Sequence, residues 1–446
     1  MSSNAQPAIL VIVGISGDLA KRKLLPAIRE IADAGMLPEQ FKIIGVSRRD
    51  VALDDVLPEG EQSYLREVID LVQLDLTDSG AYRQLGERLQ QIEASFGAAA
   101  QRLFYLSIPP QAAQPVVRQL GEAGLNEPNA KLLLEKPFGT DLASAEELIE
   151  GIRRYFTEEQ IYRIDHYMAK EMAQNIVVFR ADNPLFRRTW NGDFIESIEI
   201  IASEEQGIEG RAAFYEQTGA LRDLVQSHLL QLAALTLMEL PDSADPSTIP
   251  AKRLQALRQI QPPQDVHAQV QRGQYSTYRD EVGNPRSTVE TFTRLTLYST
   301  DPRWKDVPIV ITTGKKLNRK ATEIHVTYKQ VGETQSNTLT LRIQPNEGAE
   351  VCLWTKKPGY DNQVQQVPLD FSYSNHYEEQ LPDAYERVFV DALRADHSLF
   401  TTSDEVLASW RILAPVQHCW EMDGDDQLVQ YEQGADPEAI GAPAGD

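Results

Sequence analysis

Short apolar runs alternate with amphipathic segments along roughly the first 170 residues of the chain. The apolar runs are AILVIV, FKIIGV, DLVQLDL, RLFYLSI, AKLLLE and QIYRID, and segments with helical periodicity lie between most of them. This alternation is typical of βαβ units, in which helices cover both faces of a parallel sheet. We therefore predict a doubly wound α/β domain over residues 1–175.

The pattern changes in the second part of the chain. A helical segment, LRDLVQSHLLQLAALTLMEL, is followed by TVETFTRLTLY, VPIVITT, EIHVTY, NTLTLRI and AEVCLWT. Strand-like runs with few helices between them favour an antiparallel sheet. We predict an α+β domain with a large, mainly antiparallel sheet over residues 176–430, and an acidic flexible tail over residues 431–446.

Composition and charge exclude several classes of protein. The 446 residues are 42 % hydrophobic and 24 % charged, which suits a globular chain of two domains. The formal net charge of −23 argues against nucleic acid and anionic membranes as partners. No apolar run approaches the ~20 residues of a membrane span. Cys352 and Cys419 form no metal-binding or disulfide pattern, so we expect a cytoplasmic protein without a metal site.

A glycine-containing turn follows the first apolar run. Gly14, Gly17 and Ala20 have the spacing of a shortened dinucleotide fingerprint, in which glycine lets the backbone turn tightly and approach a pyrophosphate. A plain tight turn in an α/β protein has a similar pattern. The strand before the turn and the helix after it favour the nucleotide site.

The end of the second predicted strand bears on the choice of coenzyme. An Asp or Glu here commonly binds the ribose hydroxyls of NAD, whereas this chain has Ser47, Arg48 and Arg49. Two guanidinium groups suit the 2′-phosphate of NADP, so NADP is favoured. Asp50 lies close enough to keep NAD possible, and the arginines also fit a solvated loop.

The segment RIDHYMAKE, residues 163–171, gathers basic side chains around one carboxylate. If the chain turns helical after Ile164, His166 and Lys170 lie on one face with Tyr167 beside them. An imidazole, a phenol and an ammonium group together suit a phosphomonoester. By itself, the segment also fits the charged start of a surface helix.

A second histidine stands alone on a mostly apolar helical segment. His228 in LRDLVQSHLLQ fits a satisfied core histidine, which is the commoner case. Hydride transfer from an alcohol, however, needs a base for the hydroxyl proton, and a carboxylate that orients this base is the economical arrangement. Asp165 is the candidate carboxylate.

Eight motifs of this chain resemble those of the glucose-6-phosphate dehydrogenase family. They are GISGDLAKRKLLPAI, EKPFG, RIDHYMAKE, GALRDLVQSHLLQ, TGKKLNRK, RIQPNEG, TKKPG and LPDAYERV, in family order over nearly the whole chain. The resemblance implies a Rossmann-type NADP-binding domain and a C-terminal sheet that forms a homodimer or homotetramer. It also implies hydride transfer from C1 of glucose 6-phosphate to NADP, the first step of the oxidative pentose phosphate pathway, without a metal.

The resemblance also implies a role for each matching position. His228 would be the general base, and Asp165 would orient its imidazole. The substrate-binding residues would be His166, Tyr167 and Lys170 at the 6-phosphate, Lys136, Glu204, Asp223 and Lys315 at the sugar hydroxyls, and Lys23 between substrate and coenzyme. The coenzyme-binding residues would be Gly14, Ser16, Gly17, Asp18, Leu19, Arg48, Ser107, Pro109 and Lys136.

The chain departs from the family pattern in a few places. Region 272–292 and the C-terminus are shortened, and Ala169 stands where a glycine is common. Arg163 has no implied role beyond structure. A dehydrogenase for another aldose or aldose phosphate, or one that prefers NAD, fits the same motifs. A non-catalytic nucleotide-binding scaffold is the alternative from a different class.

Overall fold

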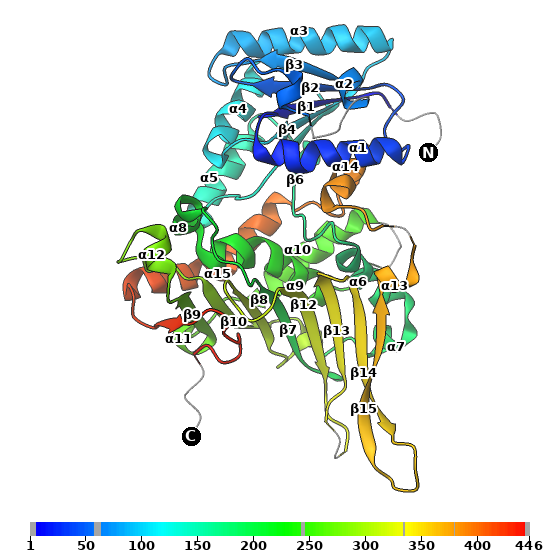
Figure 1. The fold of residues 1–446 in the computed structure, drawn as a ribbon, viewed down its shortest axis with the longest axis vertical. Coiled ribbons are helices and arrows are strands. Elements are labelled where there is room, and N and C mark those ends of the chain that lie inside the picture. Colours follow the sequence, from blue (N-terminus) through cyan, green and yellow to red (C-terminus); the bar gives the residue numbers. More distant parts are fainter. Residues whose placement is uncertain (1–5, 58–63, 242–245, 333–334, 379, 442–446) are drawn as a thin grey trace.

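The computed structural model describes residues 6–57, 64–241, 246–332, 335–378 and 380–441. Two sheets organise the chain, one in the N-terminal domain and one below it, with helices between them (Figure 1). This arrangement of a doubly wound domain and an α+β domain confirms the predicted fold class.

The N-terminal sheet is parallel throughout, with the strand order β3-β2-β1-β4-β5-β6. Its strands are β1 (Ala8–Val13), β2 (Phe41–Ser47), β3 (Ile69–Gln73), β4 (Gln101–Leu106), β5 (Ala130–Leu134) and β6 (Ile161–Arg163). Every residue of β1 is buried, as a central strand covered on both faces requires. The order reverses between β1 and β4, which is where doubly wound sheets bind nucleotides.

Helices cover both faces of this sheet. They are α1 (Leu25–Asp33), α2 (Tyr64–Val68), α3 (Ser79–Phe96), α4 (Pro110–Glu122) and α5 (Leu142–Arg153), with a π-helical turn η1 (Ala20–Leu24) and 3₁₀ turns η2 (Leu53–Asp55) and η3 (Glu158–Gln160). Separate hydrophobic clusters on the two faces contain alternate residues of β1, Leu10 on one side and Val11 on the other. The domain is therefore a layered α/β unit.

The second sheet has ten strands and is mainly antiparallel. Its strands are β7 (Ile195–Ser203), β8 (Ile260–Gln261), β9 (Val270–Tyr275), β10 (Phe292–Ser299), β11 (Ile309–Gly314), β12 (Ala321–Tyr328), β13 (Thr338–Gln344), β14 (Gly348–Lys356), β15 (Val364–Ser372) and β16 (Leu428–Tyr431). Two pairs, β7–β11 and β9–β16, are parallel. In β13, Leu339, Leu341 and Ile343 are fully buried while the residues between them are half-buried, so helices cover one face of the sheet.

Helices of the second part of the chain lie between the two sheets and around the edges of the lower sheet (Figure 1). They are α6 (Glu171–Asp182), α7 (Pro184–Thr189), α8 (Ala212–Ala220), the π-helical η4 (Leu221–Leu229), α9 (Leu230–Leu237), α10 (Ile249–Gln259), α11 (Val266–Gln269), α12 (Tyr278–Val282), α13 (Tyr373–His376), α14 (Ala384–Arg394) and α15 (Ser403–Asp423), with 3₁₀ turns η5 (Pro246–Thr248) and η6 (Pro302–Trp304). Strands β14 and β15 extend beyond the rest of the sheet as a long hairpin.

Residues 384–410 pack on the N-terminal domain although they follow the second domain in sequence. Val388 and Phe389 of α14 belong to the same hydrophobic cluster as β1, and Trp410 of α15 belongs to the cluster on the other face. Arg253 of α10 and Glu405 of α15 form a fully buried ion pair. A boundary at residue 175 therefore does not separate two independent hydrophobic cores.

The prediction of a flexible tail from residue 431 is wrong for the part that the structure describes. Tyr431 ends β16 and Ile440 lies in the same cluster, and both are about 5 % exposed. The Tyr431 hydroxyl donates to the Lys315 carbonyl at 2.7 Å. Composition alone did not reveal this packing because two apolar side chains are enough to anchor an otherwise polar segment. Residues 442–446 lie outside the described residues.

Candidate active site

A buried histidine–aspartate pair lies where the two domains meet. Asp165 comes just after β6, at the carboxyl edge of the parallel sheet, and His228 comes from η4. Nδ1 of His228 lies 2.6 Å from Oδ1 of Asp165, and the two side chains are 1 % and 4 % exposed. The structure therefore joins the two residues that the sequence predicted as base and orienting carboxylate.

The protonation of this pair suits a base. Burial disfavours the Asp165 carboxylate, but the imidazole of His228 and its hydrogen bond outweigh this and lower the pKa of Asp165 to about 2. Burial lowers the pKa of His228, although Asp165 opposes the shift. Nε2 of His228 is buried and has no hydrogen-bond partner among the described residues. At neutral pH this nitrogen carries a free lone pair.

The segment after Asp165 is a turn, which corrects the predicted helix through His166 and Lys170. Oδ1 of Asp165 accepts the amide of Tyr167 at 2.9 Å, and this bond favours a turn over a helix. Helix α6 begins only at Glu171, with Lys170 as its N-cap. Ala169 is buried and is not among the positive-φ residues, so its methyl group needs no glycine backbone.

Two aromatic rings of this turn lie against the base. The ring of His166 lies 4.5 Å from the ring of His228, and the ring of Tyr167 stacks on the ring of His228 at 4.3 Å. Burial, together with the charges of His228 and Lys136, lowers the pKa of His166 to about 3. Gln344 donates to the Tyr167 hydroxyl at 3.2 Å. The turn therefore aims two hydrogen-bonding groups at the space beside the base.

Lys136 and Asp223 form a second pair next to the base. Nζ of Lys136, which follows β5, lies 3.0 Å from Oδ1 of Asp223 in η4. Burial raises the pKa of Asp223, but Lys136 and, to a lesser extent, Lys315 lower it by more. The pKa of Asp223 therefore lies below its usual value. Residues five apart diverge by about 140° on an α-helix. The wider π-helical turn brings Asp223 and His228 towards one face.

Glu204 and Lys315 meet at one edge of the second sheet. Glu204 follows β7 and Lys315 follows β11, and these neighbouring strands are parallel with Ser203 opposite Gly314. Parallel strands end at the same edge, so the two side chains form an ion pair. Lys315 is buried, and its charge acts on Asp223. The residue that pairs with Lys315 is thus Glu204 and not its neighbour Glu205.

Lys170 lies beside a glutamate that the sequence interpretation did not assign. Its Nζ is 3.8 Å from Oε1 of Glu347, which follows β13 in the RIQPNEG motif. The other oxygen of Glu347 accepts the Met172 amide at 2.8 Å, and burial raises the pKa of Glu347. Gln344 and Glu347 had no predicted role. The RIQPNEG motif by itself does not indicate which distant side chains these two residues contact.

A pocket for a dinucleotide lies at the carboxyl ends of β1, β2 and β4. Gly14, Ser16, Gly17, Arg48, Ser107 and Pro109 line it, together with Ser47, Arg49, Leu76, Ile108 and Ala112. Gly14 has φ +92°, and a Cβ there would lie 2.2 Å from the Ser107 carbonyl oxygen. The open cradle and the two arginines fit a nucleotide with phosphate groups.

Besides Lys136, which was also predicted at the coenzyme but pairs with Asp223, three predicted residues lie outside the pocket lining. Asp18 pairs with Arg22 at 2.7 Å on the exposed side of the turn, and neither Asp18 nor Leu19 lines the pocket. Lys23 is exposed and pairs with Asp383 of the LPDAYERV motif at 3.2 Å. These residues follow the glycine turn, but the helix directs them away from the pocket lining.

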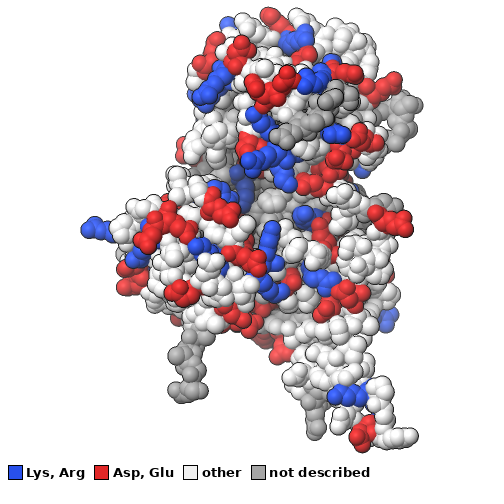
Figure 2. All heavy atoms as spheres, in the orientation of Figure 1, with Lys and Arg blue, Asp and Glu red and all other residues white. Residues whose placement is uncertain are grey.

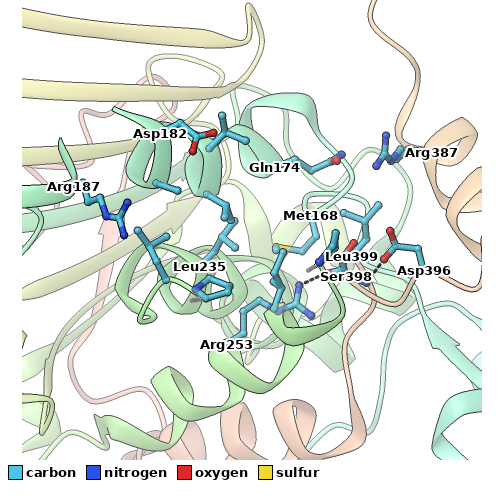
Figure 3. Close-up of a pocket in the computed structure, with 17 residues that line it drawn as sticks. Met168, Gln174, Asp182, Arg187, Leu235, Arg253, Arg387, Asp396, Ser398 and Leu399 are labelled. Atoms are coloured by element: carbon cyan, nitrogen blue, oxygen red, sulfur yellow. Dashed lines mark hydrogen bonds between the residues drawn. The ribbon is translucent and has the colours of Figure 1, made fainter. Parts of the chain in front are cut away.

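A separate cavity of about 440 Å³ lies next to the turn of residues 166–170 (Figure 3). Met168 points into it, together with Arg253, Ser398 and Leu399. None of the paired lysines or histidines described above lines this cavity. It is therefore distinct from the site at the base.

Figure 2 shows lysine and arginine side chains gathered where the two domains meet.

The nucleotide pocket and the oriented imidazole define a class, the nicotinamide-nucleotide-dependent dehydrogenases that act on an alcohol. Residues 11–175 match the domain described as "Glucose-6-phosphate dehydrogenase, NAD binding domain", and residues 177–442 match "Glucose-6-phosphate dehydrogenase, C-terminal domain". The chain belongs to the glucose-6-phosphate dehydrogenase family.

Individual relatives cover nearly the full chain. Glucose-6-phosphate 1-dehydrogenase 2 of Mycobacterium tuberculosis is 36 % identical over 96 % of this chain and 91 % of its own. Glucose-6-phosphate 1-dehydrogenase of Bacillus subtilis is 36 % identical over 94 % and 93 %. A solved glucose-6-phosphate dehydrogenase in complex with its substrate glucose-6-phosphate superposes with a TM-score of 0.92 at 31 % identity, over 100 % of this chain and 97 % of its own. No helix of the described residues is long and apolar enough to cross a bilayer.

Proposed function

We propose that the protein oxidises C1 of D-glucose 6-phosphate to 6-phospho-D-glucono-1,5-lactone with NADP as hydride acceptor. The observation that carries this proposal is the buried, unpartnered Nε2 of His228, whose Nδ1 lies 2.6 Å from Asp165. A base with one nitrogen occupied and the other free is what removal of a hydroxyl proton requires. Family membership supplies the sugar phosphate as the substrate class.

In the proposed reaction, Nε2 of His228 takes the proton of the C1 hydroxyl. The electrons of the O–H bond form the C1=O bond, and the C1–H bond breaks with its electron pair. The nicotinamide, when bound, accepts that hydride. Asp165 stays ionised and stabilises the imidazolium through Nδ1–H. Because the pair is buried, the attraction between its charges is little screened by water.

The surrounding pairs position the substrate. Lys170, His166 and Tyr167 bind the 6-phosphate, and Lys170 exchanges its 3.8 Å contact with Glu347 for phosphate oxygens. Lys136, Asp223, Glu204 and Lys315 bind the sugar hydroxyls. Their existing ion pairs hold the side chains in place before the substrate arrives, which reduces the entropy lost on binding.

A steady-state assay with purified protein tests the reaction. We expect NADPH absorbance to grow with glucose 6-phosphate and to grow far less with free glucose. Lys170→Ala should raise KM for glucose 6-phosphate about 10-fold or more and leave KM for free glucose nearly unchanged. Lys305→Ala, which removes an exposed lysine without a described partner, is the control. Equal effects on both sugars would exclude the phosphate role, and efficient turnover of another aldose would favour the alternative dehydrogenase.

The coenzyme preference rests on Arg48 and Arg49, which line the nucleotide pocket at the end of β2. A guanidinium suits the 2′-phosphate that distinguishes NADP from NAD. Arg48→Ala should lower kcat/KM for NADP about 10-fold or more and leave kcat/KM for NAD within about 2-fold. An unchanged ratio of the two values would remove Arg48 from the coenzyme site.

We also propose that the protein is a homodimer or homotetramer through the second sheet. Strand β15 is mostly exposed, and Leu369 on it is 59 % exposed. Val364 is 48 % exposed but lies five residues away, so its side chain points to the opposite face of the hairpin. Leu353 on the paired strand β14 is 38 % exposed. Apolar side chains clustered on one open hairpin are what an interface between copies buries.

A further inference from the structure

Three metal-ligating side chains meet at the edge of the second sheet, away from the site described above. His267 lies on α11, and Cys419 and Asp423 lie one turn apart on α15. One ligand atom from each residue lies within 4.8 Å of the others. Figure 1 places α11 beside β9, next to the C-terminal segment. We propose that His267, Cys419 and Asp423 bind a divalent metal ion of the zinc type, with water completing a tetrahedral shell.

The separations of the ligand atoms fit such an ion. Sγ of Cys419 lies 3.4 Å from Oδ2 of Asp423 and 3.8 Å from Nε2 of His267. Metal–ligand bonds of about 2.3 Å to sulfur and about 2.0–2.2 Å to nitrogen and oxygen place tetrahedral ligand atoms about 3.4–3.6 Å apart. The separations of Cys419 from Asp423 and from His267 are therefore within a few tenths of an ångström of this range, and all three ligand atoms lie within 4.8 Å of one another.

The neighbour of the imidazole selects the nitrogen that faces the ion. Oε1 of Gln427 lies 3.1 Å from Nδ1 of His267 and can accept its proton. That hydrogen bond leaves the lone pair on Nε2, the nitrogen 3.8 Å from Sγ of Cys419. Oδ2 of Asp423 lies 3.8 Å from Nδ1, so the Asp423 carboxylate has to turn towards Nε2 to share the ion. Histidine ligands in metalloproteins commonly donate their second N–H to an oxygen in this way, which orients the ring.

Charge and donor type select the class of metal. A thiolate and a carboxylate together balance a 2+ ion, and binding releases the thiol proton of Cys419 to solvent. The sulfur and nitrogen donors favour zinc-type ions over magnesium or calcium, which take oxygen ligands. Arg272, whose charge acts on Cys419, is engaged with the Trp420 ring and with the carbonyl of Gly424 at 3.0 Å.

The bound ion would connect two parts of the sheet edge. α11 leads directly into β9, and α15 leads towards β16, which pairs with β9 in parallel. His267 is 49 % exposed and Asp423 is 21 % exposed, so the ion can enter from solvent. The role is structural, because the three ligands belong to none of the pairs at the active site.

Cobalt titration of the full-length, chelator-treated protein tests the site. We expect a thiolate-to-cobalt charge-transfer band in the wild type that Zn²⁺ abolishes by displacement. The band should be absent in Cys419→Ser and present in Cys352→Ser, the matched variant of the other cysteine. His267→Ala should weaken Co²⁺ binding about 10-fold or more. No band in the wild type, or an equal band in Cys419→Ser, would overturn the proposal.

Alkylation of the unmodified protein gives a test that does not depend on the folding of a variant. Zn²⁺ should slow alkylation of Cys419 about 10-fold or more and leave the rate at Cys352 unchanged, as peptide mass spectrometry measures. Equal rates at Cys419 with and without Zn²⁺ would also overturn the proposal.

Discussion

At the scale of single residues, burial determines the chemistry of the two histidines at the site. His228 is buried with one nitrogen on Asp165 and the other without a partner, so it stays neutral and ready to accept a proton. His166 stays neutral because burial and nearby charges depress its pKa. Neither property follows from residue type alone.

Replacement of the base should remove most of the activity. We expect His228→Asn to lower kcat about 10²–10⁴-fold with little change in KM, because the variant removes proton transfer without removing the substrate contacts. Asp165→Asn should lower kcat in the same range. Steady-state kinetics measures both, and His418→Asn, at an exposed histidine of α15, is the control. A kcat of His228→Asn close to the wild-type value would exclude His228 as the base.

The free energy of unfolding should fall in mild acid, at a pH above that at which most carboxylates become protonated. The pKa of His166 is about 3 in the folded chain against an ordinary 6.5, so below pH 6.5 the unfolded chain binds more protons. Stability from this group is complete above about pH 6.5 and is lost as pH falls towards 3, at about 1–2 kcal/mol by pH 5.

Thermal unfolding between pH 7 and pH 5 measures this loss. The Tm of His166→Gln should fall less over that interval than the Tm of the wild type, because glutamine has no proton to gain. Parallel pH curves for the two proteins would contradict the assignment.

At the scale of elements, strand ends place the functional side chains. Asp165 and Lys136 follow adjacent parallel strands of the first sheet, and Glu204 and Lys315 follow adjacent parallel strands of the second. The carboxyl edges of both sheets therefore supply the site, and η4 adds Asp223 and His228.

The tight turn after β1 should be intolerant of a side chain. Gly14→Ala introduces a methyl group 2.2 Å from the Ser107 carbonyl at a φ of +92°, so the turn must open. We expect KM for NADP to rise about 10-fold or more, since Gly14 lines the nucleotide pocket.

The control for Gly14→Ala is Gly97→Ala, which ends α3. Gly97 also has a positive φ, of +70°, but its Cβ would meet nothing within 4 Å. Gly97→Ala should lower the free energy of unfolding by about 1 kcal/mol and leave KM for NADP unchanged. An equal change in KM for the two variants would show that strain rather than the close approach is responsible.

At the scale of the whole molecule, the two domains are joined by a segment that returns late in the sequence. Residues 384–410 pack on the N-terminal sheet, and the buried pair of Arg253 and Glu405 ties α10 to α15. The active site therefore lies between parts that share hydrophobic clusters, while the β14–β15 hairpin is left open to solvent.

The open hairpin gives a prediction about assembly. Leu369→Asp places a charge on an exposed apolar position of β15 and should weaken self-association at least about 10-fold, as analytical ultracentrifugation measures. Leu185→Asp, on α7 and 69 % exposed, is the control. A wild type that sediments as a monomer, or a Leu369→Asp variant that associates as the wild type does, would exclude the hairpin as the interface.

The sequence alone determined the order of strands and helices and the glycine turn, because these depend on local periodicity and spacing. The two-sheet architecture followed from the same pattern. Local reasoning went wrong at the turn after Asp165, where a side-chain hydrogen bond to Tyr167 overrides the helical spacing. It also went wrong in the tail, where Tyr431 and Ile440 are buried by distant partners.

Only the tertiary structure decided which groups meet. Asp165 and His228 are distant in sequence, as are Glu204 and Lys315, and strand register together with a π-helical turn brings each pair together. His267 and Cys419 carry no shared motif, yet the packing of α11 against α15 sets them 3.8 Å apart. Sequence spacing specifies local conformation, whereas contacts between distant residues depend on how the elements bury their apolar faces.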